Sequence, residues 1–249
     1  MRTSVFLKGC PLRCAWCHNP ESLRREPQLR FLAHKCVSCG KCSEKCGSNV
    51  HSFENGVHKV DFSRCTACGA CAEGCITGAL EILGREMTAE EVMATVLRDK
   101  AYYDMSGGGL TVSGGEPTFQ PEFLLELLTL AKEAGIHTCL ETNGYIPQKI
   151  MEPLTDLVDL FLLDYKITDP SALQSYTGAS GNLWNCTLET LQRAGKAVIL
   201  RLPVIPGVND TETEITAIRD FVRSLTNGVG YELLPYHPFG TDKQKALGQ

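Results

Sequence analysis

The chain has 249 residues, a mass of 27.3 kDa, 43% hydrophobic and 21% charged residues, and a net charge of −5. These values exclude a fully disordered or collagen-like chain, and the net charge gives no support to nucleic-acid binding. No stretch approaches about 18 uninterrupted apolar residues, so no membrane span is expected. The N-terminal residues lack a full apolar region and a cleavage site, so we predict no signal peptide and a cytoplasmic protein.

The first predicted element is a strand over residues 3–8, which leads into a loop with three cysteines. They are spaced C-x3-C-x2-C and are Cys10, Cys14 and Cys17. Three thiolates leave one iron of a 4Fe–4S cubane without a protein ligand, and an open coordination position marks a catalytic metal site. Three incidental cysteines, or a fourth ligand from elsewhere, remain the alternatives. Cys139 is the obvious spare, but we interpret it and Cys186 as buried packing residues.

Two further cysteine groups follow, and each has the spacing C-x2-C-x2-C-x3-C. Corresponding cysteines differ by 29 positions, which is an internal repeat. This is the two-cluster ferredoxin pattern, in which the fourth cysteine of each run ligates the other cluster. One 4Fe–4S cluster is therefore assigned to Cys36, Cys39, Cys42 and Cys75. The other is assigned to Cys65, Cys68, Cys71 and Cys46. Zinc ribbons are the alternative, although zinc prefers separated CxxC pairs. Gly47 and Ile76 stand where such runs usually have proline.

From residue 88 onward the pattern alternates between helices and strands. A capping box at Thr88–Glu91 opens a helix that ends near Asp99. Further helices are expected over 121–134, 183–194 and 210–225, with another helix before the strand that ends at 166. Strands are expected over 110–113, 137–142, 157–166, 197–204 and 231–235. Repeated βα units predict a parallel sheet with right-handed crossovers, and ligands of such sheets gather at the carboxyl ends of the strands.

Several of the expected strands end in residues that suit a ligand site. Gly114 and Gly115 leave the backbone open to close approach by a ligand, although a tight strand-to-helix turn is the favoured explanation from these residues alone. Asp164 and Lys166 end an apolar strand, where charges are expensive unless they are paired or functional, and a salt bridge to a neighbouring strand is the alternative. Arg201 suits carboxylate pairing. His237 is a candidate for the pocket mouth or a surface residue.

The segment KGCPLRCAWCHNPES, residues 8–22, resembles the cluster loop of radical S-adenosylmethionine (SAM) enzymes, and more narrowly that of the activating enzymes of glycyl radical enzymes. Downstream matches follow in the same order: SGGEPTFQ, ETNG, LLDYK, YTG, RLPVIPGVND and LLPYH. The family usually carries a further segment before this strand, whereas this chain opens at Arg2. The resemblance implies a partial (β/α)6 barrel, made of residues 1–35 and 81–249, with a ferredoxin insert at 36–80.

The resemblance also implies functional residues. The methionyl amino group of SAM would contact Gly114, Gly115 and Glu116, and Trp16 would pack near the adenine. Asp164 and Lys166 would lie in the ligand pocket, Arg201 near the methionine carboxylate, and His237 at the pocket mouth. A monovalent cation site beside that carboxylate would use Asp164 and Thr142, with Glu141 where the family often has aspartate. Together with the cluster cysteines, these are the expected site residues.

The implied activity is that of an anaerobic radical SAM oxidoreductase. It would cleave SAM reductively and abstract a hydrogen atom from a glycine of a partner glycyl radical enzyme, with three 4Fe–4S clusters. Up to residue 46 the chain has nine Lys or Arg and three Asp or Glu, and this basic excess suits an acidic electron donor such as a flavodoxin or ferredoxin. Two alternatives stay open: a radical SAM enzyme for another peptide or a small molecule, and an electron-transfer ferredoxin fused to a ligand-binding α/β domain.

Overall fold

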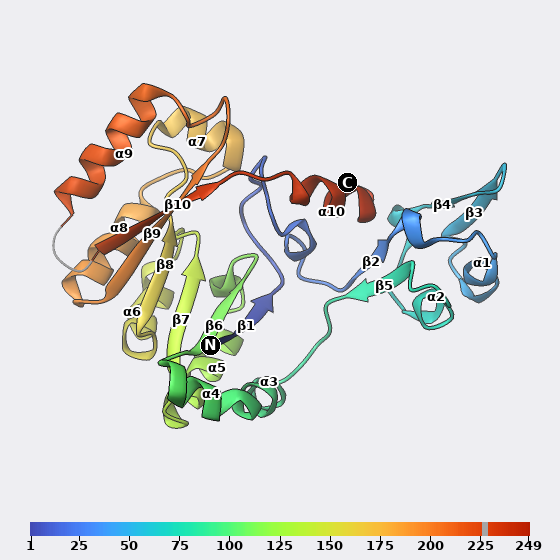
Figure 1. Cartoon of the computed structure of the whole chain (residues 1–249), viewed down its shortest axis with the longest axis horizontal. Coiled ribbons are helices and arrows are strands. Elements are labelled where there is room, and N and C mark those ends of the chain that lie inside the picture. Colours follow the sequence, from blue (N-terminus) through green and yellow to red (C-terminus); the bar gives the residue numbers. More distant parts are fainter. Residues whose placement is uncertain (226–228) are drawn as a thin grey trace.

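A six-stranded parallel sheet forms the centre of the larger part of the molecule, as the computed structural model in Figure 1 shows. The structure describes residues 1–225 and 229–249. The strand order is β1-β6-β7-β8-β9-β10, with β1 and β10 at opposite ends. Their bounds are β1 Arg2–Leu7, β6 Gly109–Gly114, β7 His137–Thr142, β8 Leu160–Asp164, β9 Ala197–Val204 and β10 Val229–Pro235. The expected parallel sheet is confirmed.

Helices connect successive strands of this sheet. Before β6 come α3 (Ala89–Val96) and α4 (Lys100–Ser106). The later helices are α5 Pro121–Glu133, α6 Gln148–Leu157, α7 Pro170–Thr177, α8 Leu183–Arg193, α9 Glu212–Ser224 and α10 Phe239–Ala246. The capping box predicted at Thr88 and Glu91 is present and opens α3. No helix among the described residues is long and apolar enough to cross a membrane.

Helices α4, α7 and α10 were not expected, because none of them carries a clear apolar stripe. Helix α4 continues from α3 through a short 3-10 turn. Helix α7 is defined mainly by its ends: the Asp169 side chain accepts from the Ala172 amide, and Gly178 ends the helix in a left-handed conformation. Local capping therefore set this helix where hydrophobic periodicity gave no signal.

The sheet and its helices share one apolar core. Strand residues such as Leu110, Leu140 and Phe161 are fully buried, and so are Leu124 and Leu128 of α5. Near-continuous apolar runs of this kind are typical of parallel strands covered by helices. The rigid core fixes where the strands end, and it thereby positions the residues that follow them.

A smaller unit interrupts the chain between β1 and β6, and Figure 1 shows it projecting to one side of the sheet. Its elements are β2 Gln28–Phe31, α1 Lys41–Lys45, β3 His51–Glu54, β4 Val57–Val60, α2 Ala70–Glu73 and β5 Leu80–Leu83. Strands β2 and β5 pair antiparallel, as do β3 and β4. The unit has its own small core around Leu29, Val50 and Leu80. It therefore extends slightly beyond the expected range 36–80.

The 29-residue repeat of the cysteines extends to these strands. Adding 29 to the bounds of β3 gives those of β5, and adding 29 to the bounds of β2 gives those of β4. The pairing register agrees, since Leu29 pairs with Ile82 in one sheet and His58 pairs with Phe53 in the other. The smaller unit is thus built from two matching halves that exchange a strand.

Candidate active site

The three-cysteine loop is held in place by backbone hydrogen bonds from distant segments. The amides of Arg13 and Ala15 donate to the carbonyls of Thr177 and Tyr176, at 2.9 and 2.8 Å. The YTG motif of residues 176–178 thus supports the loop from the end of α7. The Trp16 ring also lies beside Tyr176, with ring centroids 6.1 Å apart.

Gly114 and Gly115 bring the end of β6 against the start of this loop. A Cβ on Gly115 would lie 2.4 Å from the Gly9 carbonyl oxygen, and one on Gly114 would lie 2.2 Å from that of Leu7. Gly114 also has a φ of +119°, which disfavours any side chain. These glycines therefore permit close packing between the end of β6 and the backbone of residues 7–9. Both glycines also line the cavity described next.

A cavity of about 460 Å³ opens at the carboxyl ends of the strands, a volume within the range of small-molecule sites. The thiols of the loop line it, and the structure records all three as free. The other expected residues that line it are Trp16, Gly114, Gly115, Glu141, Thr142, Asp164, Lys166, Arg201 and His237. The fold therefore brings together residues from positions 10 to 237.

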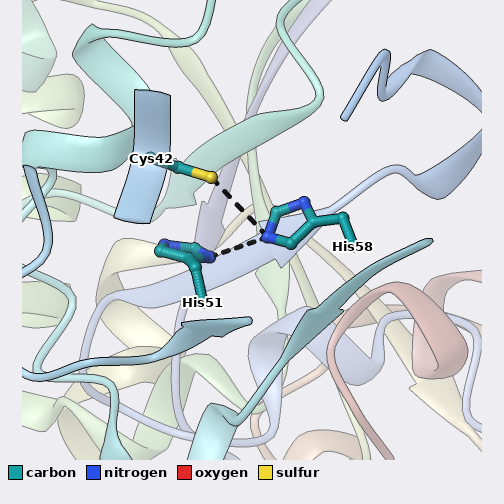
Figure 2. A group of neighbouring side chains, drawn as sticks. All are labelled: Cys42, His51 and His58. Carbon is teal, nitrogen blue, oxygen red and sulfur yellow. Dashed lines mark hydrogen bonds between the residues drawn. The ribbon is translucent and has the colours of Figure 1, made fainter. Parts of the chain in front are cut away.

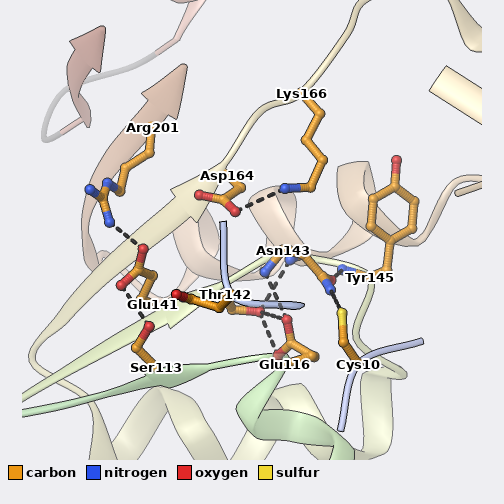
Figure 3. A network of polar contacts seen from close by, with 12 residues as sticks. Cys10, Ser113, Glu116, Glu141, Thr142, Asn143, Tyr145, Asp164, Lys166 and Arg201 are labelled. Carbon is orange, nitrogen blue, oxygen red and sulfur yellow. Dashed lines mark hydrogen bonds and ion pairs between the residues drawn. The ribbon is translucent and has the colours of Figure 1, made fainter. Parts of the chain in front are cut away.

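Two ion pairs supply charge to this cavity, as Figure 3 shows. Lys166 Nζ lies 3.0 Å from Asp164 Oδ2, and Arg201 pairs with Glu141. Ser113 Oγ donates to the same Glu141 carboxylate at 2.8 Å. Burial by itself lowers the pKa of Lys166, but the neighbouring Asp164 carboxylate and loop thiols outweigh it and raise that pKa. Lys166 is therefore a fixed cation at the cavity wall.

Glu116 differs from the expectation that it contacts a ligand. It is only 1% exposed and does not line the cavity. Its carboxylate accepts hydrogen bonds from Thr118 Oγ1 at 2.7 Å, from Thr142 Oγ1 at 2.9 Å and from the Asn143 amide at 2.8 Å. Burial raises the pKa of Glu116, while these donors favour its charged form. Its position indicates a clamp between the ends of β6 and β7.

The clamp positions Asn143, a cavity residue that the sequence analysis missed. Asn143 Nδ2 lies 3.8 Å from Cys10 Sγ, and Asn143 Oδ1 accepts from the Tyr145 amide at 3.0 Å. The available signal was its place in ETNG, directly after a strand end. The amide orients a donor toward one of the loop thiols.

The C-terminal helix covers the other side of the loop. Lys243 Nζ donates to the His18 carbonyl and to the side chains of Asn19 and Glu21, at 3.0, 3.2 and 2.6 Å. His18 Nε2 lies 2.7 Å from His237 Nδ1. The polar residues of HNPES thereby join the loop to the segment that follows β10.

The donor set of the cavity fits an iron–sulfur cluster and a small zwitterionic ligand. Burial raises the pKa of the Cys10 thiol to about 11 and also raises those of Cys14 and Cys17, so iron must displace their protons. Arg201 Nε is buried and lies 3.7 Å from Glu232 Oε2, an ion pair that is too long for a hydrogen bond. Arg201 lines the cavity wall, and the planar fork of its guanidinium suits a carboxylate ligand.

The remaining cluster cysteines line two hollows in the smaller unit. We call one hollow the first cysteine site, lined by Cys36, Cys39, Cys42 and Cys75. We call the other the second cysteine site, lined by Cys46, Cys65, Cys68 and Cys71. Each hollow thus receives three cysteines from one run and the fourth from the other. Two buried histidines, His51 and His58, lie beside Cys42 (Figure 2) and carried no signal in the sequence.

Comparisons with known proteins define the class first. Residues 62–218 match the family model of the radical SAM superfamily. Streptococcus suis SuiB bound to its precursor peptide SuiA has the same fold, with a TM-score of 0.59 over 95% of this chain and 39% of SuiB, at 14% identity. The fold and the cavity at the strand ends are those of a radical SAM protein.

Curated relatives define the family more narrowly. The choline trimethylamine-lyase activating enzyme of Oleidesulfovibrio alaskensis is 37% identical over all of this chain and 82% of its own length. The isethionate sulfite-lyase activating enzyme of the same species is 42% identical over 99% of this chain and 82% of its own length. The chain therefore belongs to the radical SAM superfamily and, within it, to the activating enzymes of glycyl radical enzymes.

Proposed function

We propose that this protein activates a partner glycyl radical enzyme. When bound, the reduced loop cluster and SAM supply the chemistry: one electron breaks a carbon–sulfur bond of SAM, giving methionine and a 5′-deoxyadenosyl radical that takes a hydrogen atom from a glycine of the partner. The observation that carries this proposal is the convergence of three free thiols with Lys166 and Arg201 on one cavity.

In this proposal the residues of the cavity bind and orient. Cys10, Cys14 and Cys17 hold the catalytic cluster and leave one iron open for SAM. Lys166 and Arg201 offer donors to the methionine carboxylate. Gly114, Gly115, Thr142, Asp164 and Trp16 would hold the amino group and adenine of SAM, and His237 would lie at the mouth. A monovalent cation would have to share Glu141 with Arg201 and Asp164 with Lys166, because both carboxylates already have side-chain partners.

We further propose that a two-cluster ferredoxin insert, made of residues 36–80 together with β2 and the rest of β5, interrupts a partial (β/α)6 barrel made of the other residues of 1–35 and 81–249. The crossed cysteine sets of the two hollows support this proposal, as does the repeat of the strands around them. Three 4Fe–4S clusters would then be present, and those of the insert would pass electrons to the loop cluster. Exposed Lys35, Lys41 and Lys45 near the first cysteine site favour an acidic donor, such as a flavodoxin or ferredoxin.

A ferredoxin fused to a ligand-binding domain is the less favoured function. It would leave three thiols facing a ligand-sized cavity without a role. A radical SAM enzyme acting on a small molecule or another peptide is disfavoured by the named relatives, which are activating enzymes for lyases, dehydratases and synthases.

The decisive experiment uses anaerobic electron paramagnetic resonance (EPR). The reduced protein is mixed with SAM and with a glycyl radical enzyme of the same organism. A glycyl doublet on the partner is the expected result, and a partner in which that glycine is replaced by alanine is the control. SAM cleavage without any doublet, together with turnover of a small molecule, contradicts the proposed function.

A further inference from the structure

Two histidines of the insert connect its two cysteine sites. His51 Nδ1 lies 3.0 Å from His58 Nε2, and both side chains are buried. His58 Nδ1 lies 3.4 Å from Cys36 Sγ, and His58 Nε2 lies 3.6 Å from Cys42 Sγ (Figure 2). The imidazole of His58 therefore contacts two of the four cysteines of the first cysteine site.

The two rings belong to different hollows. His58 lines the first cysteine site, whereas His51 lines the second cysteine site. The hydrogen bond between them thus runs from one site to the other. Phe53 stacks on His58 with ring centroids 4.7 Å apart, and Phe31 meets it edge-on at 4.6 Å. This packing fixes the orientation of the ring.

The internal repeat shows that the histidine pair is an asymmetric addition. The position 29 residues after His51 is Leu80, and the position 29 residues before His58 is Leu29. Both leucines are buried at matching places in the β2–β5 pair. Repeat symmetry would therefore put leucines or histidines in both strand pairs, but within the described strands only the β3–β4 pair carries imidazoles.

We propose that the His51–His58 pair is a hydrogen-bonded bridge that makes the two insert clusters electronically unequal, an inference that rests on the insert clusters of the proposed function. His51 donates from Nδ1 to His58 Nε2. A neutral imidazole has one N–H, so the proton of His58 is then on Nδ1 and donates to Cys36. The single N–H of His51 donates to His58. The buried Nε2 of His51 has no hydrogen-bond partner among the described atoms.

The direction of the effect follows from charge. A reduced cluster carries one more negative charge than an oxidised one, and an N–H donor to a ligand sulfur stabilises that charge. The cluster of the first cysteine site therefore has the higher reduction potential and accepts an electron before the cluster of the second. At the place that matches His58 in the β2–β5 pair, Leu29 provides no such donor.

The test measures midpoint potentials by EPR redox titration of the full chain in a Cys14→Ala background, which removes the loop cluster. The EPR signal that is lost in Cys75→Ala is assigned to the cluster of the first cysteine site. His58→Leu should shift that midpoint to a more negative value and narrow the gap between the two insert clusters. His58→Gln keeps an N–H donor and should retain part of the gap, and His51→Leu should give a smaller shift in the same direction.

His34→Leu is the matched control, because it removes an exposed histidine of the same segment and should leave both midpoints unchanged. The bridge is contradicted if His58→Leu retains about eight irons per chain but both midpoints stay in place. Fewer than about eight irons per chain in the Cys14→Ala protein with both histidines intact would overturn the insert clusters and the bridge together. Zinc bound at Cys42, His51 and His58 would do the same. Iron content therefore separates failure of the bridge from failure of its premise.

Discussion

The loop cavity and the two insert hollows use the same ligand chemistry in different surroundings. The cavity has three cysteines, ion pairs and a volume of about 460 Å³ at the ends of the strands. Each hollow has four cysteines, and apolar residues such as Val50 and Leu80 form much of the remaining wall. The same thiol ligands can thus serve two purposes.

The cavity and the hollows differ in the number of their cysteines and in the space beside them. Four thiolates complete a cubane cluster, which can then only accept and pass on electrons. Three thiolates beside a charged cavity leave a position for a ligand, and Lys166 and Arg201 supply donors for its acidic group. Under the proposed function, coordination number and available space, more than ligand type, would distinguish the proposed catalytic site from the proposed relay sites.

The substitution with the largest expected effect on this difference is Cys14→Ala. It removes one of three ligands with no replacement nearby, so SAM cleavage should be lost, while iron falls from about twelve to about eight per chain. Production of 5′-deoxyadenosine and iron content measure the two effects. Cys186→Ala, on α8 outside the cavity, is the control and should change neither. Retained 5′-deoxyadenosine in Cys14→Ala would show that the loop does not hold the catalytic cluster.

The crossed ligation of the insert is tested by Cys75→Ala. Cys75 follows α2 but lines the hollow of Cys36, so the cluster of the first cysteine site should be lost and that of the second retained. Turnover driven by the protein donor should fall sharply, whereas turnover with a chemical reductant should persist. Selective loss of the cluster ligated by Cys65 would contradict this pairing.

The electrostatics of the cavity are tested by Lys166→Met. Removing this side chain deletes a buried donor and leaves Asp164 without its partner. We expect the Kd for SAM to rise about 10- to 100-fold, as for loss of a charged hydrogen bond. Calorimetric titration measures the affinity. Lys100→Met breaks an exposed pair with Asp104 and should leave SAM binding unchanged. An equal effect of both variants on the Kd would show that Lys166 does not contribute to SAM binding.

The smallest expected effect is that of Lys41→Glu on the insert surface. Reversing an exposed charge beside the first cysteine site should lower the rate of reduction by an acidic donor about two- to fivefold, because such charges act mainly on association. The effect should shrink as salt is added. Lys149→Glu, an exposed substitution on α6, is the control. Rates that are equal in both variants would place donor docking elsewhere.

Much of this fold followed from local pattern. The strand over 137–142 has the expected bounds, and the helix expected over 121–134 is Pro121–Glu133. Apolar periodicity is strong there because these elements pack into the central core. Helix α7 gave no such signal, since its limits depend on Asp169 and Gly178 rather than on a buried face.

By itself, the sequence predicted the ligand chemistry and located the cysteine groups. Cysteine spacing within each run is a local property, so it identified the three groups and the repeat. The tertiary structure decided which distant residues meet. It buried Glu116 in a clamp outside the cavity lining, placed Asn143 beside Cys10, and joined Tyr176 and Thr177 to the loop. It also brought His51 and His58 together between the two hollows. These outcomes depend on strand register and on close backbone contacts between remote segments, which no local pattern of residues encodes.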